Sequence, residues 1–199
     1  MMGAMNPRLL LAVLALAASA ATSAPAWSTD PANTMILVAK RSLHDRVYGA
    51  TVLIVRPIGE RHVGFIVNKP TNLTLGKLFP KHLPSQKVAD PVYLGGPTGA
   101  EVIFALVKGD NPGARSLRLA PGLFLAYDSR VVDHVIETQP QQARFFAGMV
   151  MWQPNELDEE LKRGLWYVLD AQPEALLKKP CEGLWEDLVG RAERQANTI

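Results

Sequence analysis

Short hydrophobic runs separated by turn signals follow one another along most of the chain. The runs "MILVAK" at 35–40 and "TVLIVRP" at 51–57 are apolar and rich in β-branched residues, which favours buried strands. The run "HVGFIVN" at 62–68 follows after a four-residue turn, and so short a connection predicts an antiparallel hairpin with the strand at 51–57. Further runs predict strands at 92–94, 102–107, 117–119, 123–127, 143–152 and 165–171.

Helical spacing of apolar residues marks several segments between these strands. A helix is predicted to begin near Arg130, capped by Asp128 or Ser129, because these side chains can accept from free backbone N–H groups. A last helix is predicted at 182–193. Strands and helices mixed in this order predict an α/β protein of the mixed α+β kind, with a compact mixed sheet and flanking helices.

The segment at 154–163 carries a cluster of acidic residues that has two interpretations. Its acidic side chains come early and its basic side chains late, which complements the helix dipole. The spacing also predicts ion pairs between Asp158 and Lys162 and between Glu159 and Arg163. We therefore interpret the cluster as the solvated face of a helix rather than as a metal or acid–base site.

The stretch "GFIVNKPTNLTLGKLF" at 64–79 is the most informative for function. The residue before Pro70 is disfavoured in helical backbone, so the strand ends there. Asn72 or Thr74 can cap a short helix that follows. The chemistry predicts a strand, a corner and a short helix, and we interpret Asn68–Thr71 as a structural corner, leaving open that it borders a ligand groove.

The N-terminal residues 1–26 have the three-part layout of a secretory signal peptide. Arg8 precedes an uninterrupted apolar run at 9–18, and small residues follow. That run is shorter than the stretch of about 20 residues that spans a membrane. We expect cleavage after Ala20 or Ala26, export to the periplasm or the medium, and no stable membrane span afterwards. The alternative is a cytoplasmic protein with a misassigned start.

The length and composition of the chain predict that the remaining residues, 27–199, form a single globular domain. Of the 199 residues, 48% are hydrophobic and the net charge is +2, so neither disorder nor a general attraction to nucleic acid is expected. The single cysteine, Cys181, cannot form an internal disulfide. The four histidines lack metal-ligand spacing. We therefore expect no metal, no cofactor and no nucleic-acid partner.

Five segments follow one another at the spacing of a known family, and the resemblance runs from about Ile36 to Arg191. They are "AKRSLHDRVYGATVLIV", "GFIVNKPTNLTLGKLF", "PVYLGGP", "GLFLAYDSRVVDHV" and "AGMVMWQPNELDEELKRGLWYV". In these segments the chain resembles the YqgE/AlgH family. The resemblance implies a mixed α/β fold with a smaller α+β subdomain, and it implies no established reaction. The positions that match family motifs are candidate binding residues: Ser42, Asp45, Asn68, Pro70, Gly95, Gly96, Pro97, Trp152 and Pro154.

The chain also departs from the family pattern. Met151, Gln153 and Asn155 stand where relatives tend to have glycine, and each fills space or narrows backbone freedom. The signal peptide is the largest departure, because typical relatives look cytoplasmic.

Three classes of function follow. We expect a non-catalytic binding or regulatory module with an unidentified protein or small-molecule partner, because the sequence shows no nucleophile elbow and no assembled acid–base pair. The first alternative is a hydrolase that uses the loops at Ser42–Asp45, Asn68–Thr71 and Gly95–Thr98. The second, by analogy with transcription-linked relatives, is a transcriptional regulator. No catalytic residue is assigned.

Overall fold

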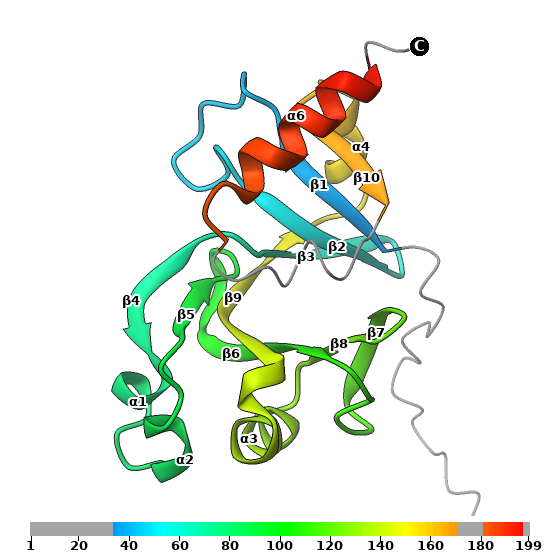
Figure 1. The fold of residues 1–199 in the computed structure, drawn as a ribbon. Helices are drawn as coiled ribbons and strands as arrows, with labels where there is room; N and C mark the ends of the chain where they lie inside the picture. The colour runs from blue at the N-terminus through cyan, green and yellow to red at the C-terminus, as the bar shows by residue number, and fades with distance from the viewer. Residues whose placement is uncertain (1–33, 171–180, 197–199) are drawn as a thin grey trace, which may run out of the picture.

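A curled sheet of ten strands forms the body of the protein. The computed structural model describes residues 34–170 and 181–196, so the predicted signal peptide at 1–26 lies outside the described residues. Strands run in the order β10-β1-β2-β3-β9-β6-β8-β7, and β4 and β5 attach at the side through β9 (Figure 1). The strands are β1 Met35–Ala39, β2 Val52–Ile58, β3 Arg61–Ile66, β4 Pro70–Thr74, β5 Pro91–Leu94, β6 Thr98–Lys108, β7 Ser116–Ala120, β8 Leu123–Ala126, β9 Ala143–Trp152 and β10 Trp166–Asp170.

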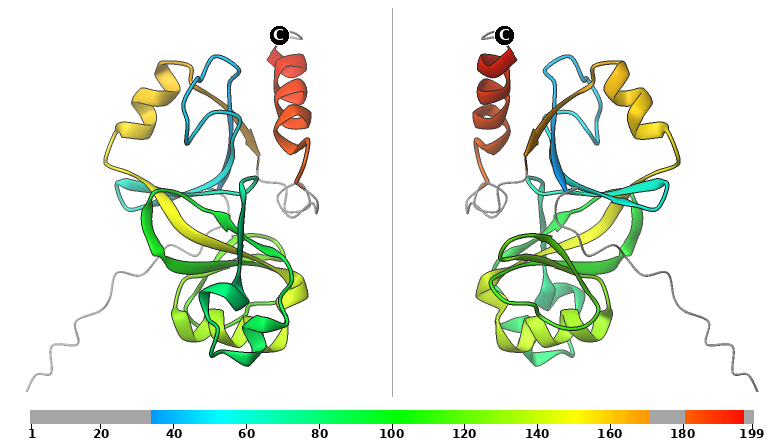
Figure 2. Two further views of the ribbon diagram at one scale, coloured as in Figure 1. Left: turned by 90° about the vertical axis from the view of Figure 1, so that its left-hand side faces the viewer. Right: turned by 90° about the vertical axis from the view of Figure 1, so that its right-hand side faces the viewer.

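Helices cover both ends of this sheet. They are α1 Leu75–Leu78, α2 Leu83–Gln86, α3 Ser129–Thr138, α4 Glu156–Lys162 and α6 Leu184–Ala196, with a 3-10 turn at Pro140–Gln142. Figure 2 shows α4 and α6 on opposite faces of the strands in the upper half, and α1 to α3 at the far end of the lower half. Within residues 34–170 and 181–196, no helix is long and apolar enough to cross a membrane.

The predicted hairpin is present. Strands β2 and β3 pair antiparallel, with Leu53 opposite Ile66 and Ile58 opposite Arg61. Among the described strands, β5 and β9 pair in parallel, with Tyr93 opposite Phe146, while the others pair antiparallel. The mixed α+β fold predicted from the sequence is confirmed.

The stretch after Asn68 differs from the prediction in one element. A short strand, β4, comes between the corner and the helix, and it pairs with β5 through Pro70 opposite Tyr93 and Thr74 opposite Pro91. A proline is tolerated at the first residue of a strand, where its missing N–H costs little. Helix α1 then begins at Leu75, and the Thr74 side chain accepts from the Lys77 N–H, as one of the two predicted caps.

Helices α3 and α4 show one prediction met and one missed. The Asp128 side chain accepts from the Arg130 N–H and caps α3, as predicted. In α4 an ion pair joins Lys162 to Glu159, three residues apart, with Nζ and Oε1 separated by 2.8 Å, whereas the predicted pairs were four residues apart. Helix α4 also begins two residues after Pro154, because Asn155 takes a left-handed backbone with φ of 67°.

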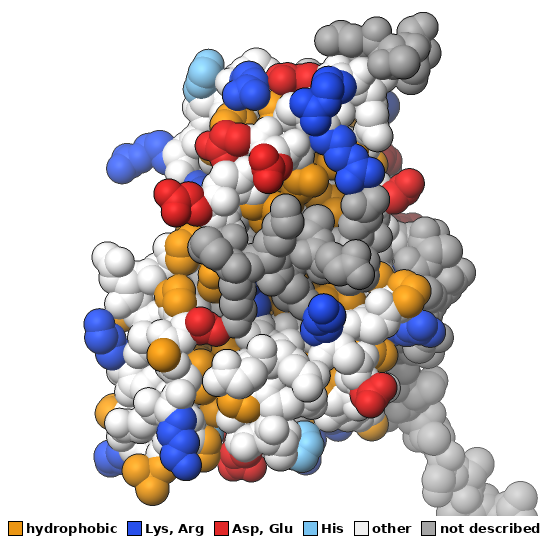
Figure 3. Space-filling model, in the orientation of Figure 1, with side chains coloured by type: hydrophobic (Ala, Val, Ile, Leu, Met, Phe, Trp, Pro, Cys, Tyr) orange, Lys and Arg blue, Asp and Glu red, His pale blue; other side chains and the backbone are white. Residues whose placement is uncertain are grey.

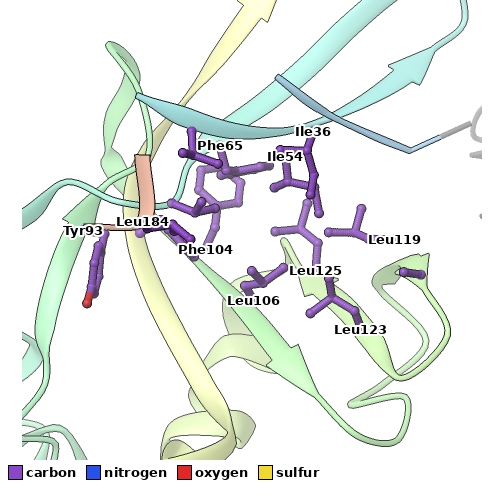
Figure 4. Packing of buried hydrophobic residues seen from close by; sticks show 14 of the residues in the cluster. Ile36, Ile54, Phe65, Tyr93, Phe104, Leu106, Leu119, Leu123, Leu125 and Leu184 are labelled. Atoms are coloured by element: carbon purple, nitrogen blue, oxygen red, sulfur yellow. The ribbon is translucent and has the colours of Figure 1, made fainter. Parts of the chain in front are cut away.

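The largest hydrophobic cluster lies between the two halves of the sheet. Ile54 and Phe65 from the upper strands face Leu119 and Leu125 from the lower strands (Figure 4). The rings of Phe65 and Phe104 meet edge to face, with centroids 5.2 Å apart, a geometry that aromatic pairs prefer. Two smaller clusters lie on the outer faces, one under α3 and one under α4.

Strand β9 belongs to both halves and gains a second partner beyond Gly148. Before this glycine, β9 pairs with β6, with Phe146 opposite Phe104; after it, Met149 still lies opposite Thr98 of β6, and Val150 lies opposite Gly64 of β3. Gly148 has φ of 70°, and an added Cβ would fall on the backbone carbonyl of Gly96. Only glycine adopts such a backbone without strain.

Candidate functional site

Asn68 holds the loop that precedes β2. Its Oδ1 accepts from the Val52 N–H at 2.9 Å, and its Nδ2 donates to the Ala50 carbonyl at 2.9 Å. Ala50 itself has φ of 54°, an uncommon backbone for a residue other than glycine. The two polar ends of the amide are therefore engaged by the backbone of one loop, as in a structural corner.

Lys69 and Asp45 fasten the same loop from two sides. Lys69 Nζ donates to the Val47 carbonyl at 2.6 Å, and burial lowers the pKa of Lys69. Asp45 Oδ1 accepts from the N–H groups of Tyr48 at 2.7 Å and Val47 at 2.8 Å. These hydrogen bonds, that of Tyr48 first, hold the pKa of Asp45 below its usual range.

The glycine pair of the third loop packs against the middle of β9. Gly95 receives the Ile66 N–H on its carbonyl and donates its own N–H to Ala147, both at 2.8 Å. A Cβ on Gly95 would fall on the carbonyl of Gly148, and one on Gly96 would fall on the backbone of Met149. Both glycines are therefore required by close backbone approach, and Pro97 follows them on the exposed surface.

The structure thus brings the three candidate loops next to one another through side-chain and backbone hydrogen bonds. The Leu94 N–H donates to the Lys69 carbonyl at 2.8 Å, which ties the glycine loop to the corner. Ser42 and His44 are exposed, and the contact between them joins the His44 N–H to the Ser42 carbonyl. Pro70 begins β4. The geometry can order backbone here, and it aligns no nucleophile with a base.

Trp152 and Pro154 lie elsewhere, at the end of β9. Trp152 is buried, and its indole N–H donates to Glu160 Oε2 at 3.0 Å. The indole N–H of Trp166 donates to the same oxygen at 2.8 Å. Pro154 is exposed and precedes α4. One side chain of the acidic cluster, Glu160, therefore has a structural role that the sequence interpretation missed.

Arg144 is a second residue that the sequence interpretation passed over. It lies inside the β9 run, is 1% exposed, and donates from Nη1 to the Val67 carbonyl at 2.7 Å. Its guanidinium carbon stands 4.6 Å from the centre of the Tyr93 ring, an arrangement typical of a cation–π contact. Burial lowers the pKa of Arg144. The sequence did contain a signal for this residue, because Arg144 is the single charged residue in the otherwise apolar run at 143–152.

A groove opens between α3, the segment after α1, and the start of β6; we call it the groove. Its volume is about 540 Å³, and residues from all three elements line it: Phe79, His82, Glu101, Val102, Ile103, Ser129, Val132, Asp133 and Ile136. None of the nine candidate positions lines it. Among the described residues, no group of three or more His, Cys, Asp or Glu side chains is placed to hold a metal ion.

Comparisons of the sequence and of the structure with known proteins point to the same family. The AlgH-like family model (DUF179) matches residues 36–197. A UPF0301 protein of Bacteroides fragilis is 28% identical over 81% of this chain and 83% of its own length, and one of Methylococcus capsulatus is 29% identical over 78% and 88%.

Two solved structures share the fold. The crystal structure of a Corynebacterium diphtheriae protein matches with a TM-score of 0.67 at 21% identity, over 81% of this chain and 87% of that one. The solution structure of the AlgH protein from Pseudomonas aeruginosa matches with a TM-score of 0.65 at 21% identity, over 87% and 91%. The resemblance inferred from the five sequence segments is confirmed: this chain belongs to the AlgH-like family, whose UPF0301 members are uncharacterised.

Proposed function

We propose that the protein is an exported, non-catalytic binding module that holds a segment of a partner protein in the groove. The occupant would carry a strip of apolar side chains flanked by Lys or Arg. The observation that carries this proposal is the apolar floor of the groove together with its carboxylates, with no Lys or Arg among the described residues that line it.

Exposed apolar side chains gather around the groove. Phe79 is 41% exposed and Val102 is 40% exposed, although both are large and hydrophobic. Other exposed large hydrophobic residues lie on β4, α1 and α2, in the same part of the fold: Leu73, Leu78 and Leu83. Neighbouring exposed apolar residues, rather than scattered single ones, are typical of protein-binding surfaces.

The charges at the groove favour a basic partner. Glu101 and Asp133 line it, and Glu137 lies beside it, with Oε1 at 3.8 Å from His82 Nε2. Carboxylates around an apolar floor attract a segment with Lys or Arg at its edges and disfavour an acidic one. The partner is therefore a basic amphipathic segment.

The contacts of the candidate loops support binding over hydrolysis. The side chains of Asn68 and Lys69 and the Oδ1 of Asp45 hold backbone groups of their own chain, which gives these residues a structural role in the loop. Acidic and basic side chains are interspersed on the face in Figure 3, which offers no basic stripe for DNA.

A designed peptide tests the groove. The probe is a synthetic amphipathic peptide of leucine and lysine, about 14 residues long, which makes about four helical turns. We expect its addition to shift the NMR methyl signals of Val102, Ile103 and Val132. The double substitution Glu101→Lys with Asp133→Lys should weaken binding at least about tenfold, because it converts attraction into repulsion.

Helix α4 offers the matched control, because it is acidic and none of its residues lines the groove. Glu156→Lys with Asp158→Lys makes the same change in net charge and should leave the affinity within about twofold. Equal weakening by both double variants would show that only net charge is sensed and would overturn the proposal. Equal binding of a leucine–glutamate peptide would overturn it as well.

Export rests on the layout of residues 1–26 and is tested separately. Cell fractionation followed by N-terminal sequencing should find a mature protein outside the cytoplasm that begins at Ala21 or Trp27. An intact chain in the cytosol would contradict export and would leave the groove experiment standing.

A further inference from the structure

A second hollow lies between the two halves of the sheet; we call it the cavity. Its volume is about 250 Å³, and its wall is largely apolar, formed by strands β2, β3, β6, β7, β8 and β9. Most lining residues on β2 and β3 alternate along each strand, so they share the inner face of the sheet; Val55, which also packs in the outer cluster, is the exception. Figure 4 shows part of this wall, where Ile54 and Phe65 stand opposite Leu119 and Leu125.

The cavity is built into rigid strands rather than into loops. Its deep walls are buried and include Ile54, Phe65, Phe104, Leu119 and Leu125. Its outer part consists of half-buried side chains, among them Val63, Met149 and Met151. An apolar cavity with preformed walls binds an apolar group without first reorganising, which favours binding of a small molecule.

The charged side chains that line the cavity are arginines. Arg61 lies at the β2–β3 turn and is exposed, opposite Ile58 of β2. Arg56 is 4% exposed and donates from Nη1 to Thr34 Oγ1 at 3.1 Å. No acidic side chain is among the described residues of the lining. The charged side chains in the lining are therefore both cationic.

We infer that the cavity binds a small anionic amphiphile, a medium-chain carboxylate, with its hydrocarbon tail between the sheets and its carboxylate at Arg61. The volume accommodates about eight methylene-sized groups if each takes about the 30 Å³ that a water molecule occupies in the liquid. A guanidinium is the side chain best suited to a carboxylate, because it donates two parallel N–H groups. This site is separate from the groove and does not depend on it.

A chain-length series of carboxylates measures the fit of the tail. Titration of the purified protein with butanoate, hexanoate, octanoate and dodecanoate should show affinity rising by about fourfold per added methylene, the ratio that about 0.8 kcal/mol gives. The rise should end near octanoate, when the cavity is full. An affinity that keeps rising to dodecanoate indicates adsorption to an open surface and would overturn the inference.

Methionine methyl groups report where the probe lies. With methyl-labelled methionine, octanoate should shift the signals of Met149 and Met151, which line the cavity. Met35 packs against the cluster on the outer face, so its signal should stay in place as an internal control. Shifts at Met35 alone, or at none of the three, would contradict binding in the cavity.

Two substitutions separate the head from the tail. Arg61→Glu should weaken octanoate binding by at least about fivefold and should leave 1-octanol unaffected, because only the carboxylate meets the charge. Met151→Trp fills the outer cavity and should weaken both ligands. The matched control is Arg118→Glu on β7: Arg118 is exposed and lies between two lining residues, so its side chain points away from the cavity. Equal effects of Arg61→Glu and Arg118→Glu would overturn the assignment of the head group.

Discussion

The loop corner and the cavity use their residues in opposite ways. In the corner, formed by residues 42–51, 68–71 and 95–98, the polar side chains of Asp45, Asn68 and Lys69 hold backbone groups. In the cavity, apolar side chains leave about 250 Å³ unfilled beside two arginines. The polar residues that resemble catalytic groups thus stabilise the fold. The apolar residues, which resemble those of an ordinary hydrophobic core, leave space for a ligand.

Because of this difference, substitutions in the corner and in the cavity should affect different properties of the protein. Substitutions in the corner should lower stability and leave octanoate affinity unchanged wherever the protein is still folded. Substitutions that line the cavity should change affinity as well. Within the corner, we expect the loss of stability to decrease from Gly96 to Asn68 to Asp45.

The largest effect is expected at Gly96. In Gly96→Ala the added methyl group would fall on the backbone of Met149, and the strands on both sides would have to move. We expect a loss of about 3 kcal/mol of unfolding free energy in urea titrations. Gly190→Ala in α6 is the control, because it replaces a helical glycine beside the flexible end of Arg194 and should gain a few tenths to about 1 kcal/mol.

An intermediate effect is expected at Asn68. Asn68→Ala removes the acceptor of Val52 and the donor to Ala50, so we expect a loss of about 1 to 3 kcal/mol in the same urea titration. Asn72→Ala, at an exposed position four residues further, should change stability by less than about 0.5 kcal/mol. If Asn68→Ala instead abolished octanoate binding in a protein of unchanged stability, the corner would belong to a ligand site.

The smallest effect is the pH dependence of Asp45. Its pKa in the folded protein lies below the value of about 3.9 in an unfolded chain, so its contribution is complete above that value and is lost as pH falls through the folded pKa. We expect the drop in stability between about pH 5 and about pH 3 to be smaller in Asp45→Asn than in the parent. Equal drops would show that the Asp45 carboxylate carries no such dependence.

The sequence predicts local elements well because their causes are local. The β2–β3 hairpin follows from two apolar runs and a short turn, and the caps at Asp128 and Thr74 follow from the preference of helix N-termini for such side chains. Strand β4 was missed because its pairing with β5 joins residues about twenty positions apart. Nothing in the run "PTNLT" itself, which is mostly exposed, marks it as a strand.

Site residues are harder to predict, because their roles depend on what the fold brings together. Glu160 looks like the other acids of α4, and only the positions of Trp152 and Trp166 distinguish it as a hydrogen-bond acceptor. The cavity cannot be inferred from the residues that line it, because apolar residues such as Phe65 and Leu119 are equally typical of a hydrophobic core without a cavity. Asn155 is the exception: a position where relatives tend to have glycine does have a left-handed backbone here, and asparagine tolerates one.

The backbone conformation of Gly148 determines which side chains of β9 pack between the sheets and which pack in the outer cluster. Up to Phe146 the even-numbered side chains face the space between the sheets; beyond Gly148, Met149 packs there instead, and Val150 turns to the outer cluster. The single left-handed residue Gly148 therefore changes which side chains of β9 face the space between the sheets, from the even-numbered to the odd-numbered positions. A regular extended backbone at this residue would turn Met149 and Met151 away from the hollow that they border, whereas deletion of the residue would keep both facing it.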